Sequence, residues 1–216
     1  MVTVNDFFDK VYVINLKSRN DKLDLCKAEL QKHGIKFEVF NAIVGNPGVE
    51  VYTKFLINKP GAVGCLLSHV GVIEDAKKRG LEKILILEDD VEFCENFTNK
   101  FDKFVNDLPD NWDMFYLGGS AHTNNSNKQF LTSITDNIAK TTCTMTTSSY
   151  GINKNIFDIV IENALKMIEP IDSMYKYRIQ SGYNCYVTRP NLAWQKPGHS
   201  DIANAHRDYT SFMKNK

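Results

Sequence analysis

The sequence has no excess of charge of either sign. Its 216 residues include 26 Lys and Arg and 26 Asp and Glu, which leaves a formal net charge of zero at pH 7. Proteins that hold nucleic acid or an anionic membrane through an electrostatic field carry a clustered positive excess. We therefore expect no nucleic-acid partner and no polybasic membrane arm.

The chain also lacks a long apolar run. Its start, residues 1–6, has neither the basic nor the apolar stretch of a secretion signal, and no segment approaches the roughly 20 apolar residues of a transmembrane helix. The length and the hydrophobic content of 43% suit one soluble domain over residues 1–216. Peripheral membrane association and the oligomeric state stay open.

Paired cysteines are missing as well. The five cysteines are an odd number without CxxC spacing, namely Cys26, Cys65, Cys94, Cys143 and Cys185. This pattern predicts reduced, mostly buried thiols instead of a disulfide framework or a zinc site. Together with the absence of a signal segment, it predicts a cytoplasmic protein.

Glycine-rich phosphate loops do not follow the first predicted strand. Residues 11–16 are almost continuously apolar, residues 21–33 have helical spacing, and residues 36–40 form a second predicted strand. This order of strand, helix and strand predicts an α/β fold, with a mostly parallel central sheet flanked by helices. The absence of GxGxxG and Walker sequences argues against dinucleotide oxidoreductases and P-loop proteins.

Polar residues come directly after the first predicted strand. Asn15 and Arg19 lie where this strand ends, and open α/β sheets bind ligands beyond the carboxyl ends of their strands. Both side chains could therefore meet a nucleobase or a diphosphate. They suit a helix cap and a surface charge equally well, and the sequence leaves these alternatives open.

The most informative stretch contains a helical pattern followed by an acidic cluster. Residues 62–79 have helical spacing, and the apolar strand at residues 83–87 ends in Glu88, Asp89 and Asp90. If the backbone stays extended, Glu88 and Asp90 point to one side and can share a cation. Carboxylates suit Mn²⁺ or Mg²⁺, which usually complete their ligand shell with substrate phosphates. A helix cap and a solvated turn would also explain the three acids.

The rest of the chain offers weaker signals. Residues 120–128 predict a loop, which is either a substrate lid or a surface turn. Pro170 ends a predicted helix, and Asp172 is expected to cap the next one. In the polar tail, His199 and Asp201 could reach a metal ion.

Six short elements occur in a specific order along the chain. They are Val13-Ile14-Asn15-Leu16 with Arg19, Gly64-Cys65-Leu66-Leu67-Ser68-His69, Ile86-Leu87-Glu88-Asp89-Asp90-Val91, Tyr116-Leu117-Gly118, Pro170-Ile171-Asp172, and Gln195 with Ser200-Asp201-Ile202. In this order, over about residues 11–202, the chain resembles glycosyltransferase family 25. That family includes bacterial lipooligosaccharide galactosyltransferases and collagen hydroxylysine galactosyltransferases.

The resemblance implies a single domain of the GT-A fold type and transfer of a hexose with inversion. The donor would be a UDP-sugar, most often of galactose and alternatively of glucose, and the acceptor a hydroxyl of a glycan or of a protein-linked group. A nucleotide-binding part would span about residues 10–120 and an acceptor-side part about residues 121–216.

The resemblance also assigns roles to residues. It places Mn²⁺ (or Mg²⁺) and the diphosphate at Glu88, Asp89 and Asp90, with His199 or Asp201 as a further metal contact. The nucleotide would be held by Asn15, Arg19, Ala42 and Gly45. Ser68 and His69 would contact the sugar or the diphosphate, although a lone histidine on a helix is also common as a surface or core side chain.

An inverting transferase needs one base that takes the proton of the acceptor hydroxyl. The first choice is Asp172, expected at a helix start beside late strands, and the second is Asp89. Two rival functions remain open. A non-catalytic nucleotide-sugar or glycan-binding module would bind without turnover. A sugar-phosphate nucleotidyltransferase would release pyrophosphate, but it usually carries a glycine-rich loop after the first strand, which this chain lacks.

Overall fold

A mixed sheet forms the centre of the molecule. The computed structural model describes residues 1–46, 53–121 and 130–214. Within them the sheet has eight strands, in the order β2 (Glu38–Asn41), β1 (Lys10–Asn15), β3 (Lys83–Glu88), β10 (Ser149–Asn153), β5 (Met114–Tyr116), β11 (Cys185–Thr188), β8 (Ile138–Thr141) and β7 (Leu131–Ser133). All of these strands except β10 and β8 point the same way, so the mostly parallel sheet that the sequence predicts is confirmed.

Helices and short strand pairs complete the fold. The helices are α1 (Val4–Phe7), α2 (Asn20–Lys32), α3 (Pro60–Lys78), α4 (Phe97–Asn106), α5 (Phe157–Leu165), α6 (Ile171–Met174) and α7 (Thr210–Met213), with a 3₁₀ turn η1 (Lys154–Ile156) and a π-helical segment η2 (Tyr175–Ile179). The antiparallel pairs are β4 (Val91–Phe93) with β12 (Ala193–Gln195), β6 (Ser120–Ala121) with β9 (Thr144–Met145), and β13 (Gly198–Ser200) with β14 (Ala205–Arg207). Most of the loop predicted at residues 120–128 lies outside the described residues.

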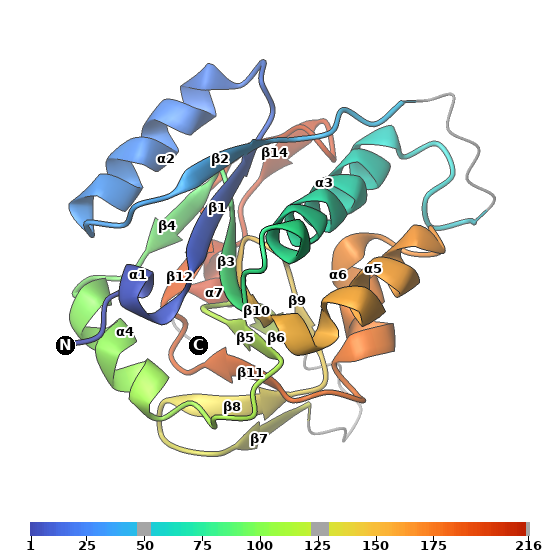
Figure 1. Cartoon of the computed structure of the whole chain (residues 1–216). Coiled ribbons are helices and arrows are strands. Elements are labelled where there is room, and N and C mark those ends of the chain that lie inside the picture. The colour runs from blue at the N-terminus through green and yellow to red at the C-terminus, as the bar shows by residue number, and fades with distance from the viewer. Residues whose placement is uncertain (47–52, 122–129, 215–216) are drawn as a thin grey trace.

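Alternating side chains bury both faces of the sheet. On β1, Val11 and Val13 pack into one apolar cluster with residues of α1, α2 and α4, whereas Tyr12 and Ile14 pack into a second cluster with residues of α3, α5 and α6. Figure 1 shows α2 and α4 on one side of the sheet and α3 and α5 on the other. Each aliphatic side chain buried in this way stabilises the fold by roughly 1.5–3 kcal/mol. The helices on both faces therefore hold the sheet in place, and the site lies at one edge of this sheet.

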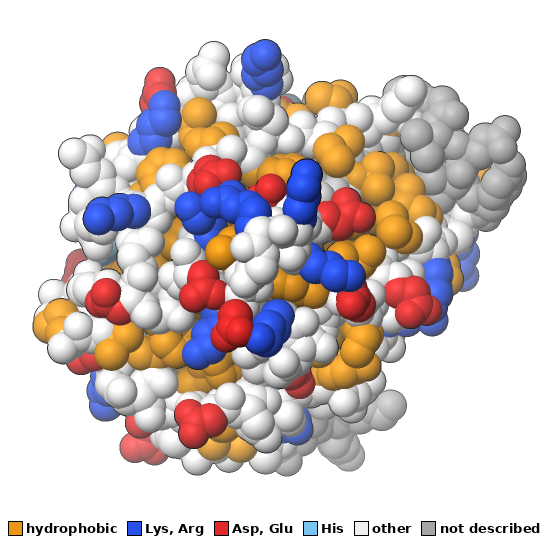
Figure 2. All heavy atoms as spheres, in the orientation of Figure 1, with side chains coloured by type: hydrophobic (Ala, Val, Ile, Leu, Met, Phe, Trp, Pro, Cys, Tyr) orange, Lys and Arg blue, Asp and Glu red, His pale blue; other side chains and the backbone are white. Residues whose placement is uncertain are grey.

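The surface agrees with the balanced composition. Figure 2 shows acidic and basic side chains interspersed on the face turned to the viewer. None of the described helices combines the length and the apolar character needed to cross a membrane. All five cysteines are free, as their spacing predicts.

Candidate functional site

The ends of three parallel strands meet at one edge of the sheet. In the β1 pairings, Asn15 lies beside Asn41 and Ile14 lies beside Glu88. The segments that follow these strands therefore gather at the carboxyl edge, where α/β sheets bind ligands. A cavity of about 300 Å³, here the first cavity, opens at this edge. Its lining includes Leu16, Lys22, residues 42–45, Gly61, Cys65, Ser68, His69, residues 88–90, Gln195 and residues 200–202.

The acidic cluster lies in the first cavity in a different geometry from the one expected. β3 ends at Glu88, and Asp89 and Asp90 form a turn before β4. The extended backbone therefore ends at Glu88, and the expectation that strand alternation points Glu88 and Asp90 to one side does not apply. All three acidic residues nevertheless line the first cavity.

Antiparallel strands bring two further polar residues to these acids. Because β10 runs against β3, the residues before β10 return to the same edge, and the Thr147 hydroxyl donates to Glu88 Oε1 at 2.7 Å. β12 pairs antiparallel with β4, and Gln195 Nε2 donates to Asp90 Oδ2 at 2.8 Å. Two of the three carboxylates are thus held by side chains from distant parts of the chain.

The electrostatics of the cluster fit a divalent cation. Burial raises the pKa of Asp89 to about 6, against the opposing effect of Lys22. Burial and the neighbouring Glu88 also raise the pKa of Asp90. Asp90 Oδ1 is buried and has no hydrogen-bond partner among the described residues. A bound Mn²⁺ or Mg²⁺ would offset the repulsion between the acids and would occupy this oxygen.

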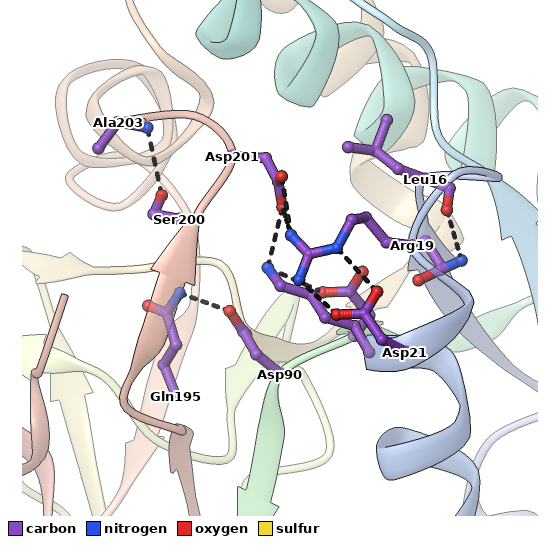
Figure 3. A network of polar contacts seen from close by, with 11 residues as sticks. Leu16, Arg19, Asp21, Asp90, Gln195, Ser200, Asp201 and Ala203 are labelled. Carbon is purple, nitrogen blue, oxygen red and sulfur yellow. Dashed lines mark hydrogen bonds and ion pairs between the residues drawn. The ribbon is translucent and has the colours of Figure 1, made fainter. Parts of the chain in front are cut away.

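Two basic residues of the α2 start lie beside the acids. Lys22 Nζ lies 3.8 Å from Asp89 Oδ1 and 3.1 Å from Asp201 Oδ2. Arg19 Nη1 donates to both carboxylate oxygens of Asp201, and Arg19 Nε and Nη2 donate to Asp21 (Figure 3). Partial burial acts to raise the pKa of Asp201, but the hydrogen bonds from Arg19 and Lys22 outweigh it and lower this pKa. This network joins α2 to the chain segment after β13 at the rim of the first cavity.

A serine and a glycine position the backbone of the first cavity. The Ser68 hydroxyl accepts a hydrogen bond from Ile43 N at 2.8 Å and donates to Gly64 O at 2.7 Å. A Cβ atom on Gly64 would lie 2.5 Å from Ile43 O and 2.6 Å from Gly45 N. Glycine is therefore needed where α3 meets the cavity-lining segment 42–45.

A second cavity of about 600 Å³ adjoins the first. The two cavities share Cys65, Glu88, Gln195, Ser200 and Ile202. Asp172 lines the second cavity, and burial raises its pKa. The N-cap expected at Asp172 is wrong: the backbone is extended at Pro170, which is the N-cap, and Asp172 Oδ1 accepts from Ser173 N at 2.6 Å inside the first turn.

The structure brings together most of the residues singled out in the sequence. Ala42, Gly45, Ser68, His69, Glu88, Asp89, Asp90 and Asp201 line the first cavity. Asn15, Arg19 and His199 line neither cavity. Asn15 is buried and donates to Leu16 O at 2.8 Å, and His199 is exposed on β13. The chemical roles of all these residues stay predictions.

Among the residues of the site that had no predicted role are Lys22, Thr147 and Gln195, which contact the acids. Lys22 stands in the first turn of the helix after β1, so its position in the sequence indicated a place near the carboxyl end of that strand. Thr147 and Gln195 reach the acids through antiparallel strand pairings, which local sequence patterns do not reveal.

Known proteins match a large part of this chain. A family model described as "Glycosyltransferase family 25 (LPS biosynthesis protein)" matches residues 8–175. A human protein named "Inactive glycosyltransferase 25 family member 3" is 34% identical in an alignment 130 residues long, which covers 51% of this chain and 22% of that protein. The mouse "Procollagen galactosyltransferase 2" is 31% identical in an alignment 130 residues long, which covers 51% of this chain and 21% of that protein. The match thus spans about a fifth of the length of these relatives.

A solved structure is also similar. It is the crystal structure of a glycosyltransferase involved in the glycosylation of the major capsid of PBCV-1. The sequence identity is 14% and the TM-score is 0.45, with 78% of this chain and 74% of that chain covered.

Proposed function

Because the chain belongs to glycosyltransferase family 25, we propose that it transfers a hexose from a UDP-sugar to a hydroxyl group in a metal-dependent reaction. The observation that carries the proposal is the partly buried cluster of Glu88, Asp89 and Asp90, which lines one cavity together with the cation Lys22. Galactose is the first candidate for the sugar, since the name of the mouse relative specifies a galactosyltransferase. The acceptor would be a hydroxyl of a glycan or of a protein-linked group.

The first cavity would hold the donor. Glu88 and Asp90 would bind Mn²⁺ or Mg²⁺, with Asp201 as the further contact, and the ion would neutralise the charge of the leaving diphosphate. Lys22 offers an ammonium group to the same diphosphate. The segment 42–45 would lie along the nucleotide, in the backbone position that Ser68 fixes.

The second cavity would hold the acceptor. Asp172 would accept the proton of the attacking hydroxyl. Burial raises the pKa of Asp172 toward neutral pH, and a general base works best when its pKa lies near the working pH. Asp89 is the second candidate, because its pKa is raised to about 6. Donor and acceptor would meet at the wall that both cavities share.

The test begins with ligand-dependent stability. UDP-galactose, UDP-glucose and GDP-, CMP- and dTDP-sugars are added with and without Mn²⁺, and the melting temperature is measured. Only UDP-sugars with Mn²⁺ should raise the melting temperature. A ligand that binds the native state at a hundred times its dissociation constant stabilises that state by about 2.7 kcal/mol. Equal shifts for all nucleotides, or none, would contradict the proposal.

A variant then tests the acidic cluster. Asp90→Asn should lower Mn²⁺-dependent transfer at least about a hundredfold, since metal stabilisation of the transition state contributes several kcal/mol. Asp110→Asn changes an exposed aspartate and serves as the matched control. Full activity of Asp90→Asn would remove the metal assignment.

A second function has one observation in its favour. The human relative is named an inactive member of the family, so a nucleotide-sugar-binding module without turnover is the alternative. It predicts the same UDP-sugar shift but no UDP release with any acceptor. Release of pyrophosphate from a nucleoside triphosphate and a sugar phosphate would instead indicate a nucleotidyltransferase.

A further inference from the structure

We propose that Cys65, His69 and Glu88 form a second cation site, which takes a borderline-soft divalent ion of the Zn²⁺ class. One ligand atom of each residue lies within 4.8 Å of the other two. The site goes beyond the proposed function, which uses an ion held by oxygen ligands only. It lies on the wall between the two cavities, because Cys65 and Glu88 line both.

The fold places His69 and Glu88 at the separation that two ligands of one bound ion require. Cys65 and His69 are four residues apart on α3 and therefore lie on the same face of the helix, above the end of β3. His69 Nε2 lies 3.5 Å from Glu88 Oε1. Nitrogen and oxygen ligands of a tetrahedral Zn²⁺, each about 2.0–2.1 Å from the ion, lie about 3.4 Å apart.

The surroundings of His69 favour metal binding through Nε2. The ring is fully buried, and His69 Nδ1 lies 2.8 Å from Tyr150 Oη, which lies 2.9 Å from Tyr175 Oη. We assign the proton to Nδ1, so that Nδ1 donates to Tyr150 and Tyr150 donates to Tyr175. Metal-binding histidines are commonly oriented by such a hydrogen bond from the other ring nitrogen. The lone pair of Nε2 then points toward Glu88 and Cys65.

This assignment leaves an arrangement that a cation completes. His69 Nε2 is buried without a hydrogen-bond partner among the described residues, and 3.5 Å is long for a hydrogen bond to Glu88. A nitrogen lone pair and a carboxylate oxygen thus face each other with no donor between them. An ion between Nε2 and Oε1 would give Nε2 a partner and would be a second partner of Oε1, which already accepts from the Thr147 hydroxyl.

The ligand types separate this site from the oxygen-rich one. Thiolate and imidazole ligands select Zn²⁺, whereas carboxylates such as Asp89, Asp90 and Asp201 suit Mn²⁺ and Mg²⁺. Glu88 would belong to both sites. In a consequence that rests on the proposed function, Zn²⁺ held by Cys65 and His69 would withdraw Glu88 from the donor ion and inhibit transfer.

The direct test is the ligand shell of the wild-type protein. X-ray absorption at the zinc edge is measured on the full chain with one equivalent of Zn²⁺, without substrate. One sulfur at about 2.3 Å and one imidazole are expected. A shell of nitrogen and oxygen only would overturn the proposal. It would favour the other tautomer of His69, in which Nε2 carries the proton and points it toward Glu88.

Cobalt and two cysteine variants locate the thiolate. Metal-free protein titrated with Co²⁺ should develop a sulfur-to-cobalt charge-transfer band that Zn²⁺ removes. Cys65→Ser should lack the band and Cys94→Ser, the control at a buried cysteine outside the site, should keep it. A band that survives in Cys65→Ser would overturn the proposal.

A third variant tests the orientation of His69. Tyr150→Phe should weaken Zn²⁺ binding about 10- to 100-fold, the usual effect of removing such an orienting partner, while the charge-transfer band remains. Unchanged Zn²⁺ affinity would contradict the assigned proton position. These readouts need no donor sugar, so their failure is separate from a failure of the UDP-sugar and Mn²⁺ test.

Discussion

Arg19 and Asp201 are 182 positions apart, yet Arg19 Nη1 donates to both carboxylate oxygens of Asp201, at 2.8 and 2.6 Å. The ion pair ties the start of α2 to the segment after β13, at the rim of the cavity that we assign to the donor. The two side chains are 21% and 32% exposed, so solvent weakens the pair only in part.

A double-mutant cycle measures this connection. Arg19→Ala and Asp201→Ala, singly and together, should show a coupling of about 0.5–1 kcal/mol in the free energy of unfolding by urea. The pair of Lys27 with Asp24 is the control, since its side chains are 49% and 72% exposed, and its coupling should lie near zero. Strictly additive effects of the first two substitutions would contradict the connection.

Asp172→Asn tests the proposed base. A lost general base lowers kcat about 10²- to 10⁴-fold. Binding of the UDP-sugar with Mn²⁺ should stay unchanged in a thermal-shift measurement, because Asp172 lines only the second cavity. Glu162→Gln, at an exposed carboxylate of α5, should behave as wild type. Normal turnover of Asp172→Asn with loss of turnover in Asp89→Asn would move the role to Asp89.

Asp89 should make the protein less stable as the pH rises. Its pKa is about 6 in the folded protein, above the ordinary 3.8 of an aspartate, so the folded state binds more protons than the unfolded state between these values. The free energy of unfolding of the metal-free protein should therefore fall between about pH 4 and pH 6. Asp89→Asn should show a smaller fall and should be about 2 kcal/mol more stable than wild type at pH 7.

Urea unfolding at several pH values measures this effect. Asp24→Asn is the control, because Asp24 is exposed on the same helix as Lys22, and its curve should run parallel to that of wild type. An Asp89→Asn curve that also runs parallel to wild type would show that Asp89 is not the source of the pH dependence.

Gly64→Ala should destabilise the protein, although alanine normally stabilises a helix by up to about 1 kcal/mol relative to glycine. The new Cβ would meet backbone atoms, Ile43 O at 2.5 Å and Gly45 N at 2.6 Å. We expect a loss of about 1–3 kcal/mol and weaker UDP-sugar binding, measured by thermal unfolding with and without ligand. Gly71→Ala is the control on the same helix, since its Cβ would meet only the movable ring of Phe40. A gain in stability for Gly64→Ala would contradict the close approach.

Local patterns predicted the elements that carry the site. The helix expected at residues 62–79 is α3 (Pro60–Lys78), and the strand expected at residues 83–87 is β3. The helix has apolar residues at helical spacing and packs on one face of the sheet, and the strand is continuously apolar and buried on both faces, so local and tertiary preferences agree. The acids also lie at the predicted strand end.

The remaining features depend on contacts between distant segments. The direction of β10, which brings Thr147 to Glu88, is set by pairing with strands far away in the sequence. The cysteine spacing argued against a zinc site, because CxxC patterns do not describe a set with two residues on a helix and one on the next strand. Such a set becomes visible only when α3 is packed against β3.

The wall shared by the two cavities has a consequence for redesign. A substitution at Gln195 or Ser200 would change the recognition of both substrates of a transferase, because these residues line both cavities. Arg207 and Tyr209 line only the second cavity. Libraries restricted to these two positions are therefore the place to seek new acceptors while the preference for the donor stays constant.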